Sequence, residues 1–439
     1  MSKKLVYFIE TRRKINGVQT IIPDILEKMP SECDVETFYM NYYKNQDTPD
    51  ILEAPDCANN ESLIEKDKNA QDVLYDENSS LKFVNLYNCD FSEFEDATFI
   101  VPLNYLFFLL PYVSQYKSIK ICPYIYDEIC FTNFFKQMKR PNIKEIVKML
   151  NESNSCLFRD GARTSGWVYG IDQFGECIIP QSTERYICDP TIKHRFEPEH
   201  ISIAWIGDVS KTALGCINRI CEDLYNLFGV DDDGNRTNVN MFDFHIIGSG
   251  AIMGQVNFRK FNPLIRFIFP GSLKEAALDN YITENIDVSF GYNMNAVRGA
   301  ICNTLTLIPA IDDDPVYAKR TYVYFKDIDD FNLCWKKREL HEYSYNDYTM
   351  KEVIDRLIST DLREIDTSEC YNLALKHFSF TENAKRISEF SDNSSLTVET
   401  LLSNDSISGV LEEFNNYRDN LENSNEFTYY DYFNRNKKI

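Results

Sequence analysis

Four glycines, each at the end of a short apolar segment, are the residues of this chain best suited to holding a ligand. They are Gly207, Gly248, Gly271 and Gly291. The segments before them are rich in β-branched and aromatic residues, which is typical of strands. Ligands of a parallel sheet lie beyond the carboxyl ends of its strands, where these glycines would form the turns. The spacing therefore predicts a ligand site at these four turns.

Metal chemistry is not indicated by the sequence. The five histidines are isolated, whereas a metal site gathers His, Cys, Asp or Glu at close spacing. Three acidic D-x-D patterns are interpreted most simply as charged loops, at residues 231–233, 312–314 and 327–329. The thirteen cysteines include no C-x-x-C pair, and their scatter favours a reducing cytoplasm over secretion. We therefore expect neither a metal nor disulfides.

The elements that must position the glycines alternate between strand and helix. Strands are expected at residues 201–207, 242–248, 265–271, 286–291 and 304–309. Between the first two, apolar residues recur every three or four positions over residues 213–228, which predicts a helix. Strand, helix and strand at this spacing imply right-handed crossovers, so we expect a doubly wound parallel sheet.

The first half of the chain follows the same pattern less regularly. Strands are expected at residues 5–9, 98–101 and 119–126, with an apolar helix over 102–113 between the last two. No G-x-G-x-x-G follows the first strand, which disfavours a dinucleotide-binding domain. The first half is therefore predicted to be a second, less regular α/β domain.

The length of 439 residues exceeds one ordinary hydrophobic core, so two domains are expected. The predicted bounds are 1–190 and 199–385, with a proline-containing linker over residues 189–198. Residues 386–439 are expected to form a helical tail that packs back on the N-terminal domain.

Charge and hydropathy exclude two classes of function. The net charge of −22 argues against nucleic-acid binding, because phosphate backbones need clustered Lys and Arg. The most apolar window, residues 99–113, is interrupted by prolines and is too short to span a bilayer. The amino terminus is interpreted as a first strand rather than a signal peptide. A cytoplasmic protein is predicted; peripheral membrane contact through residues 107–112 or 12–14 is the weaker alternative to a core helix and a loop.

Several of these segments together resemble a known architecture. The predicted second domain, residues 199–385, is similar to the nucleotide-sugar half of GT-B glycosyltransferases. It is most like glycosyltransferase family 4, of the type found in polysaccharide and capsule synthesis. The residues that carry the resemblance are 203–211, 244–248, 267–271, 287–300 and 304–309. Residues 377–386 resemble the helix that precedes the return to the first domain, and Asn16, Gly17 and Gln19 lie in a loop similar to the acceptor-side loop of that family. The resemblance implies two Rossmann-like domains that face each other across a cleft.

The resemblance assigns a nucleotide-sugar donor to the glycine turns. Gly207 would let the backbone approach the diphosphate, and Lys211 would add a positive charge. Asp208 stands where that family usually has arginine. The remaining implied donor-binding residues are Gly248, then Pro270, Gly271 and Ser272 at the nucleobase end, and Gly291, Asn293, Asn295 and Arg298 under the sugar and diphosphate.

Arg298 departs from the family pattern, because a glutamate that grips the ribose hydroxyls usually occupies its position. Arginine cannot accept a hydrogen bond from a hydroxyl, but it can clamp a diphosphate with two N–H groups. The helix that follows Asn295 would point its N-terminus at the phosphates.

Catalysis would need a group facing the donor from the first domain. That family often has a histidine there, but the first histidine of this chain is His194, so Asp127 or Glu128 is the predicted base. The resemblance implies retention of configuration, no metal and no cofactor other than the nucleotide sugar as co-substrate. The expected acceptor is a saccharide or a lipid-linked saccharide at the inner membrane face.

Three functions remain open on the sequence. The first is the glycosyltransferase. The second is a non-catalytic GT-B partner or saccharide-binding subunit, because Asp208 and Arg298 depart from the family pattern. The third is a non-hydrolysing sugar-nucleotide epimerase, which would need clustered acids and histidines that the sequence does not show.

Overall fold

The structure is a computed structural model of the chain, and it describes a defined part of the residues. The described residues are 3–10, 24–31, 33–40, 82–85, 89–125, 134, 143–159, 177–180, 182–184, 196–230, 241–250, 253–256, 258–273, 275–310, 322–328, 333 and 346–422.

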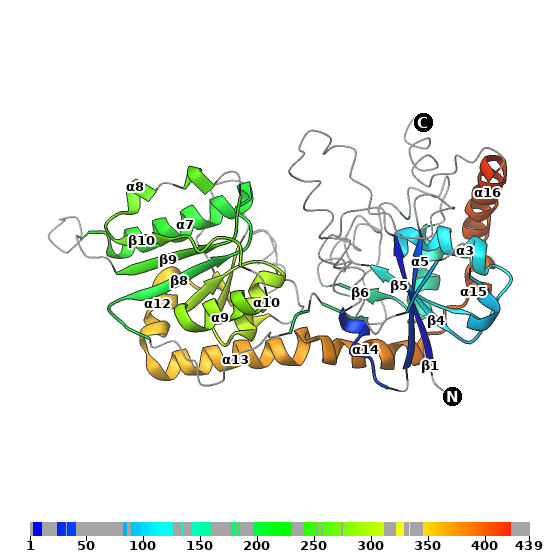
Figure 1. Ribbon diagram of the computed structural model, residues 1–439, viewed down its shortest axis with the longest axis horizontal. Coiled ribbons are helices and arrows are strands. Elements are labelled where there is room, and N and C mark those ends of the chain that lie inside the picture. The colour runs from blue at the N-terminus through cyan, green and yellow to red at the C-terminus, as the bar shows by residue number, and fades with distance from the viewer. Residues whose placement is uncertain are drawn as a thin grey trace. The chain divides into compact units, whose positions relative to one another are not determined.

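Two compact units make up the chain, each built on its own sheet (Figure 1). Unit 1 contains Met1–Pro180 and Phe380–Ile439, and unit 2 contains Gln181–Ser379. The chain therefore passes between the units twice, and the first passage falls before the linker expected over residues 189–198.

The sheet of unit 2 has six strands in the order β10-β9-β8-β11-β12-β13. The strands are β8 (Ile201–Ile206), β9 (Phe242–Ile247), β10 (Ile265–Ile268), β11 (Val288–Phe290), β12 (Leu305–Pro309) and β13 (Tyr322–Tyr324). The first five are parallel, and β13 runs antiparallel to β12. The chain thus moves outward from β8 to one edge of the sheet, then returns to the other side of β8 and moves to the opposite edge.

Helices cover both faces of this sheet (Figure 1). They are α7 (Lys211–Phe228), α8 (Phe258–Phe261), α9 (Glu275–Asn285), α10 (Met294–Ile301), α12 (Met350–Ile358) and α13 (Thr360–Phe378), with one-turn 3-10 helices at Met253–Gln255 and Phe325–Asp327. Strand β8 shows how the two faces form: Ile203 and Trp205 pack with α7 and α12, whereas Ala204 and Ile206 pack with α9, α10 and α13. Because both faces are buried, all six residues of β8 are buried.

Unit 1 has a seven-stranded parallel sheet in the order β3-β2-β1-β4-β5-β6-β7. The strands are β1 (Lys3–Glu10), β2 (Cys33–Met40), β3 (Lys82–Asn85), β4 (Thr98–Pro102), β5 (Lys120–Ile125), β6 (Leu157–Phe158) and β7 (Cys177–Ile178). The helices between them are α3 (Leu106–Val113) and α5 (Ile143–Glu152), with 3-10 helices at Phe91–Phe94 and Leu103–Tyr105. The strand order repeats that of unit 2, with a reversal between β1 and β4.

The C-terminal helices belong to unit 1. They are α14 (Phe380–Asn393), α15 (Val398–Leu402) and α16 (Asp405–Glu422). Leu396, Leu401 and Ile407 are fully buried in the same apolar cluster as α3 and β4. The hydroxyl of Ser155 accepts hydrogen bonds from the backbone N–H groups of Ser395 and Leu396, at 3.1 and 3.0 Å. The tail is therefore part of the core of unit 1.

The structure confirms the predicted fold class of two doubly wound α/β domains with a C-terminal helical segment returning to the first. It also contains strand β2, which pairs with β1 along eight residues and was absent from the prediction. The segment that forms β2, Cys33–Met40, carries Asp34 and Glu36 in its first half and lies next to a polar stretch, so it lacks the continuous apolar run that marked the other strands.

Candidate functional site

The reversal of strand order in unit 2 marks a candidate site. Strands β8 and β11 are neighbours, but α7, which follows β8, and α10, which follows β11, cover opposite faces of the sheet. The connections therefore diverge at the carboxyl ends of these strands, and the crevice outside such a point is where doubly wound sheets bind ligands. Gly207 follows β8 and Gly291 follows β11, so both predicted glycines lie at this point.

Glycine is required where the turns meet, because a side chain would collide with a neighbouring turn. Gly207 has φ +124°, and a Cβ there would strike the amide of Asn295. Gly248 has φ +156°, and a Cβ there would strike the carbonyl of Gly207. Two hydrogen bonds of 2.9 Å, from Gly207 N–H to Ile247 and from Val209 N–H to Ser249, join the β8 and β9 turns. Two of the predicted glycine turns, at Gly207 and Gly248, therefore lie against each other, and the side chain of Asn295 packs on the first of them.

Helix α7 begins at this surface. Ser210 caps it, with its hydroxyl accepting from the N–H of Ala213 at 3.2 Å. The first N–H groups of a helix have no partner within the helix and carry partial positive charge, which favours an anion. Lys211, the first residue of α7, is exposed and adds a full charge. Asp208 is exposed one turn before it, so the site carries one charge of each sign on this side.

The turn from β11 to α10 supplies the other side of the crevice. Asn293 precedes α10 with φ +50°, and its N–H donates to the carbonyl of Leu333 at 3.2 Å. The N–H of Asn295 donates to Tyr292 at 3.0 Å, so the first turn of α10 is tightly wound. The ring of Tyr292 meets that of Trp205 edge to face, with ring centroids 5.3 Å apart. A buried aromatic side chain of β8 therefore packs against this turn. Helix α10 begins at Met294, close to the start expected from the sequence.

Arg298 differs from its predicted role as a diphosphate clamp. Its Nη1 donates to the carbonyl of Glu184 at 2.8 Å and to both carboxylate oxygens of Asp279 at 3.2 Å. The Arg298 side chain is 13% exposed and that of Asp279 is 0% exposed. This pair links α9 to α10, and removing either partner would leave a buried charge without compensation, so Arg298 is engaged within the protein rather than presented to a ligand.

The predicted nucleobase residues lie at the edge of the sheet, two strands from β8. Gly271 has φ +82° and open space around its Cα, while Pro270 is half-buried and Ser272 is exposed. Phe269, just before them, is 46% exposed and meets Phe258 edge to face at 5.4 Å. Neighbouring strands are about 4.8 Å apart, so this turn is roughly 10 Å from the Gly207 turn.

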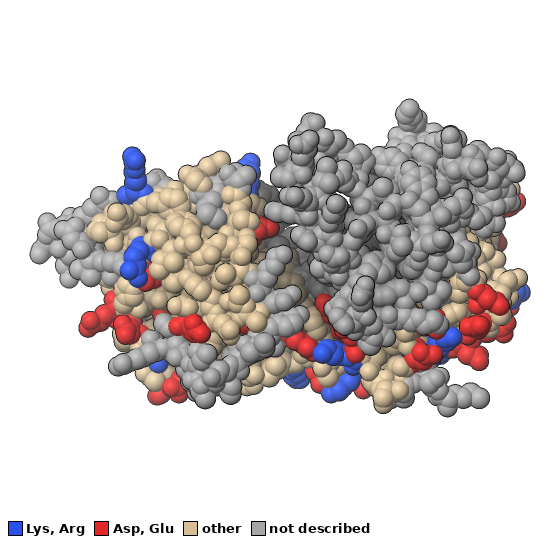
Figure 2. All heavy atoms as spheres, viewed as in Figure 1, with Lys and Arg blue, Asp and Glu red and all other residues tan. Residues whose placement is uncertain are grey.

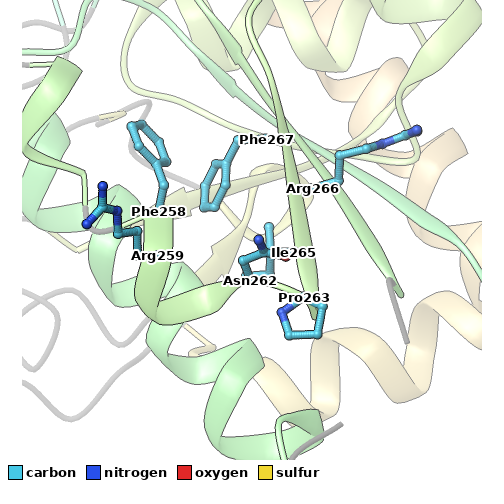
Figure 3. A pocket seen from close by; sticks show the side chains of 7 residues that line it. All are labelled: Phe258, Arg259, Asn262, Pro263, Ile265, Arg266 and Phe267. Atoms are coloured by element: carbon cyan, nitrogen blue, oxygen red, sulfur yellow. The ribbon is translucent and has the colours of Figure 1, made fainter. Parts of the chain in front are cut away.

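A groove of about 450 Å³ runs beside this edge, between α8 and β10 (Figure 3). Phe258 and Phe267 meet edge to face in it, with ring centroids 4.7 Å apart, and Arg266 points away from them. Its lining residues are Phe258, Arg259, Asn262, Pro263, Ile265, Arg266 and Phe267. The groove adjoins the predicted nucleobase turn through Phe258 but lies away from the β8–β11 crevice.

An ionic cluster occupies the amino end of the same strands. Asp243 accepts hydrogen bonds from Arg266, and its carboxylate lies 2.8 Å from Nε2 of His200. Burial alone would raise the pKa of the Asp243 carboxyl, but the hydrogen bonds from Arg266 and His200 outweigh burial and hold that pKa below its usual range. Because this cluster lies at the opposite ends of the strands from the glycine turns, it stabilises the sheet and does not face the crevice.

Several predicted residues lie outside the described residues. They are the acceptor-side Asn16, Gly17 and Gln19 and the predicted bases Asp127 and Glu128. Within the described ranges, no three His, Cys, Asp or Glu side chains gather as metal ligands would. None of the described helices combines the length and apolar character that crossing a membrane requires. In Figure 2, the described surface of the face shown carries acidic side chains beside separate Lys and Arg side chains.

Two features of the site were not predicted. Gly250 follows Gly248 and Ser249, and a Cβ on it would crowd the backbone of Val209, so the second turn needs two glycines. The Gly-x-Gly spacing at 248–250 was a visible signal for this. The burial of Asp279 had no comparable signal, because an acidic residue in a helix is usually solvated.

Comparison with known proteins adds evidence on the fold. No protein-family model matches this chain, and no curated protein matches it. The apo form of the lipopolysaccharide outer core galactosyltransferase WaaB is similar, with a TM-score of 0.50 and 10% identity over 88% of this chain and 98% of WaaB.

Two further solved structures have lower scores. A trehalose-6-phosphate structure from E. coli, bound with UDP-2-fluoro glucose, has a TM-score of 0.49 and 10% identity over 90% of this chain and 100% of that one. A glycosyltransferase from Rickettsia africae has a TM-score of 0.48 and 10% identity over 89% and 98%. The two doubly wound units and the likeness to WaaB show that this chain has the GT-B fold.

Proposed function

We propose that this protein is a glycosyltransferase that moves a sugar from a nucleotide-activated donor to a saccharide or lipid-linked saccharide acceptor. The observation that carries the proposal is the backbone surface at the β8–β11 reversal, where Gly207, Gly248 and Asn295 come together beneath the N-terminus of α7. Glycine backbone that a ligand can approach closely, next to a helix N-terminus and a lysine, suits the diphosphate of a nucleotide sugar.

The same parts can assist the chemistry. Breaking the bond between sugar and diphosphate leaves negative charge on the leaving oxygen, and positive groups fixed in advance stabilise that charge. Lys211 and the first N–H groups of α7 are such groups, with the Asn295 amide on the opposite side of the crevice. We propose transfer with retention and without a metal, with Asp127 or Glu128 as the base and Asn16, Gly17 and Gln19 on the acceptor side.

The nucleobase end belongs at the edge turn of Pro270, Gly271 and Ser272. The half-exposed ring of Phe269 offers an apolar face beside it. The backbone of this turn would supply the hydrogen bonds that select the base. Donor selectivity would therefore rest on this turn rather than on the diphosphate surface.

Localisation and pathway belong to the same proposal. We place the enzyme in the cytoplasm, at the inner face of the membrane where lipid-linked acceptors are found, in the synthesis of a capsule or another polysaccharide by a family 4 type of reaction. The family resemblance of the sequence motifs supports this part of the proposal.

Thermal unfolding against a panel of nucleoside diphosphates and nucleotide sugars tests the donor site. A ligand at 100 times its Kd should add about 2.7 kcal/mol to the free energy of unfolding. Stabilisation by diphosphates of one base, but not by the corresponding nucleoside, is the expected result. A well-folded sample that responds to none of the panel would overturn the proposal.

A second function is favoured by one observation. Arg298 replaces the expected ribose-gripping glutamate and is held by Asp279, so one of the usual donor contacts is missing. A GT-B protein that has lost donor binding would serve as a non-catalytic partner or a saccharide-binding subunit. Binding of a labelled nucleotide sugar, and its consumption when a saccharide acceptor is added, separate the two functions, because the non-catalytic protein would show neither.

A further inference from the structure

The two ends of unit 2 are joined to each other. The chain enters this unit at Gln181 and leaves it after Ser379. Close to these points, the N–H of Thr183 donates a 2.9 Å hydrogen bond to the carbonyl of Phe378. Thr183 is 1% exposed and Phe378 is fully buried. The entering and leaving segments therefore form one buried pair.

Arg298 of α10 connects the entering segment of this pair to α9 through hydrogen bonds. Its Nη1 binds the carbonyl of Glu184, the residue after Thr183, and the same nitrogen binds Asp279 on α9. Phe378 packs in the same apolar cluster as Ala296, Val297 and Ala300 of α10. The contact between α10 and the two chain ends is thus both polar and apolar.

Helix α10 connects the Gly207 turn of the candidate site to the two chain ends of unit 2. Asn295 lies in its first turn and packs against Gly207 in the crevice. Arg298 lies three residues later, about 4.5 Å along the helix axis. A helix this short moves as one body, so a change in its first turn is passed to Arg298 without an intermediate element.

We infer that Arg298 is a positioning residue that couples occupancy of the donor site to the two chain ends of unit 2. The inference rests on the proposed function, because it takes the ligand to be a nucleoside diphosphate. Binding in the crevice fixes the first turn of α10, and Arg298 then holds residues 182–184 and 376–379 more firmly. This role explains an arginine at a position where the resemblance implies a ribose-gripping glutamate. The two segments are the connections to unit 1, so they can report donor binding to the other half of the chain.

Hydrogen exchange measured by mass spectrometry on the full chain tests the coupling. UDP, GDP and ADP are added separately to the wild type, Arg298→Gln, Arg298→Lys and Asp279→Asn. At ten times its Kd, a ligand slows exchange that requires its release by roughly tenfold. In the wild type, the diphosphate that binds should slow exchange both at residues 291–297 and at residues 182–184 and 376–379.

The variants separate coupling from binding. In Arg298→Gln and Asp279→Asn, slowing at 291–297 should persist while slowing at the two end segments is lost, and Arg298→Lys should recover part of it. A loss of structure alone would speed exchange with and without nucleotide and would not remove the response selectively. Arg266→Gln, which breaks an arginine–aspartate pair on β10, is the matched control and should keep the full response.

Two results would overturn the inference, and they are distinguishable. Equal slowing of the end segments in the wild type and in a folded Arg298 or Asp279 variant removes Arg298 from the coupling but leaves the donor site standing. Absence of slowing at 291–297 in the wild type with all three diphosphates removes the donor site, and the coupling with it.

Discussion

Single residues decide whether the crevice can accept a ligand, and Gly248 is the most demanding of them. We expect Gly248→Ala to lower the free energy of unfolding by about 1–3 kcal/mol, because the new Cβ would strike the backbone of Gly207 in a region of positive φ. Nucleotide-dependent stabilisation should also disappear, since the β8 turn must move. Urea unfolding with and without nucleotide measures both effects.

Gly215→Ala is the matched control for that substitution. Gly215 is exposed in the second turn of α7, and a Cβ there meets nothing within 4 Å. Alanine should therefore stabilise the helix by about 0.5–1 kcal/mol. If Gly248→Ala behaves like Gly215→Ala, the close approach of the two turns is not a requirement of the fold.

Lys211 is the charged residue that the proposed donor site depends on. Because it is exposed, its attraction to a diphosphate is weakened by water, and Lys211→Ala should raise the nucleotide Kd roughly threefold to tenfold, or about 0.7–1.4 kcal/mol. Isothermal titration at low and high salt measures this, and the difference should shrink at high salt. Lys351→Ala on α12 should leave Kd unchanged; an equal effect from both would indicate a general charge effect.

At the scale of elements, the pairing of β9 with β10 carries a pH-dependent contribution. The folded pKa of Asp243 is depressed, so its stabilisation is present above the unfolded pKa of about 3.9 and is lost as pH falls through the folded value. We expect Asp243→Asn to cost roughly 1–2 kcal/mol at pH 7, since Arg266 is largely solvated, and the difference from wild type to begin to shrink near pH 4 and to vanish only once the pH lies below the depressed folded pKa. Urea unfolding across that pH range checks the trend.

The control for Asp243 is Asp355→Asn on α12. Asp355 pairs with Lys351 in an exposed i,i+4 arrangement. Such pairs are worth about 0.5 kcal/mol or less, so its removal should have little effect at any pH. A difference between Asp243→Asn and wild type that persisted into acid would show that packing, rather than charge, is responsible.

The sequence predicted strands and turns better than it predicted contacts between individual side chains. The strands of unit 2 were predictable because both faces are buried, which makes them continuous apolar runs such as Ile201–Ile206. Strand β2 was not, because its Asp34 and Glu36 break the run, although Glu36 is only 4% exposed. The glycine turns followed from the strand ends. The pairing of Arg298 with Asp279 did not, because those residues are 19 positions apart and only the packing of α9 on α10 brings them together.

At the scale of the whole molecule, the C-terminal tail completes the core of unit 1. Leu401 is 0% exposed in a cluster with α3 and β4, so Leu401→Ala should cost about 2–5 kcal/mol by leaving a cavity. Leu402→Ala, on the adjacent and only partly buried side chain, should cost less. Differential scanning calorimetry of both variants should show the loss in the transition of unit 1, and an unchanged transition would show that the tail is dispensable.

The hydrogen bond between Thr183 and Phe378 makes unit 2 an inserted domain whose two ends are tied together, because these residues lie near its first and last positions. A module whose ends meet can be removed and the host closed with a short linker. Replacing residues 181–379 by a few Gly and Ser residues should leave unit 1 folded, since Met1–Pro180 and Phe380–Ile439 share one core, and circular dichroism with proteolysis would test it. Under the proposed function, donor selectivity could then be exchanged between transferases by transplanting one contiguous gene segment, leaving the acceptor half of the recipient untouched.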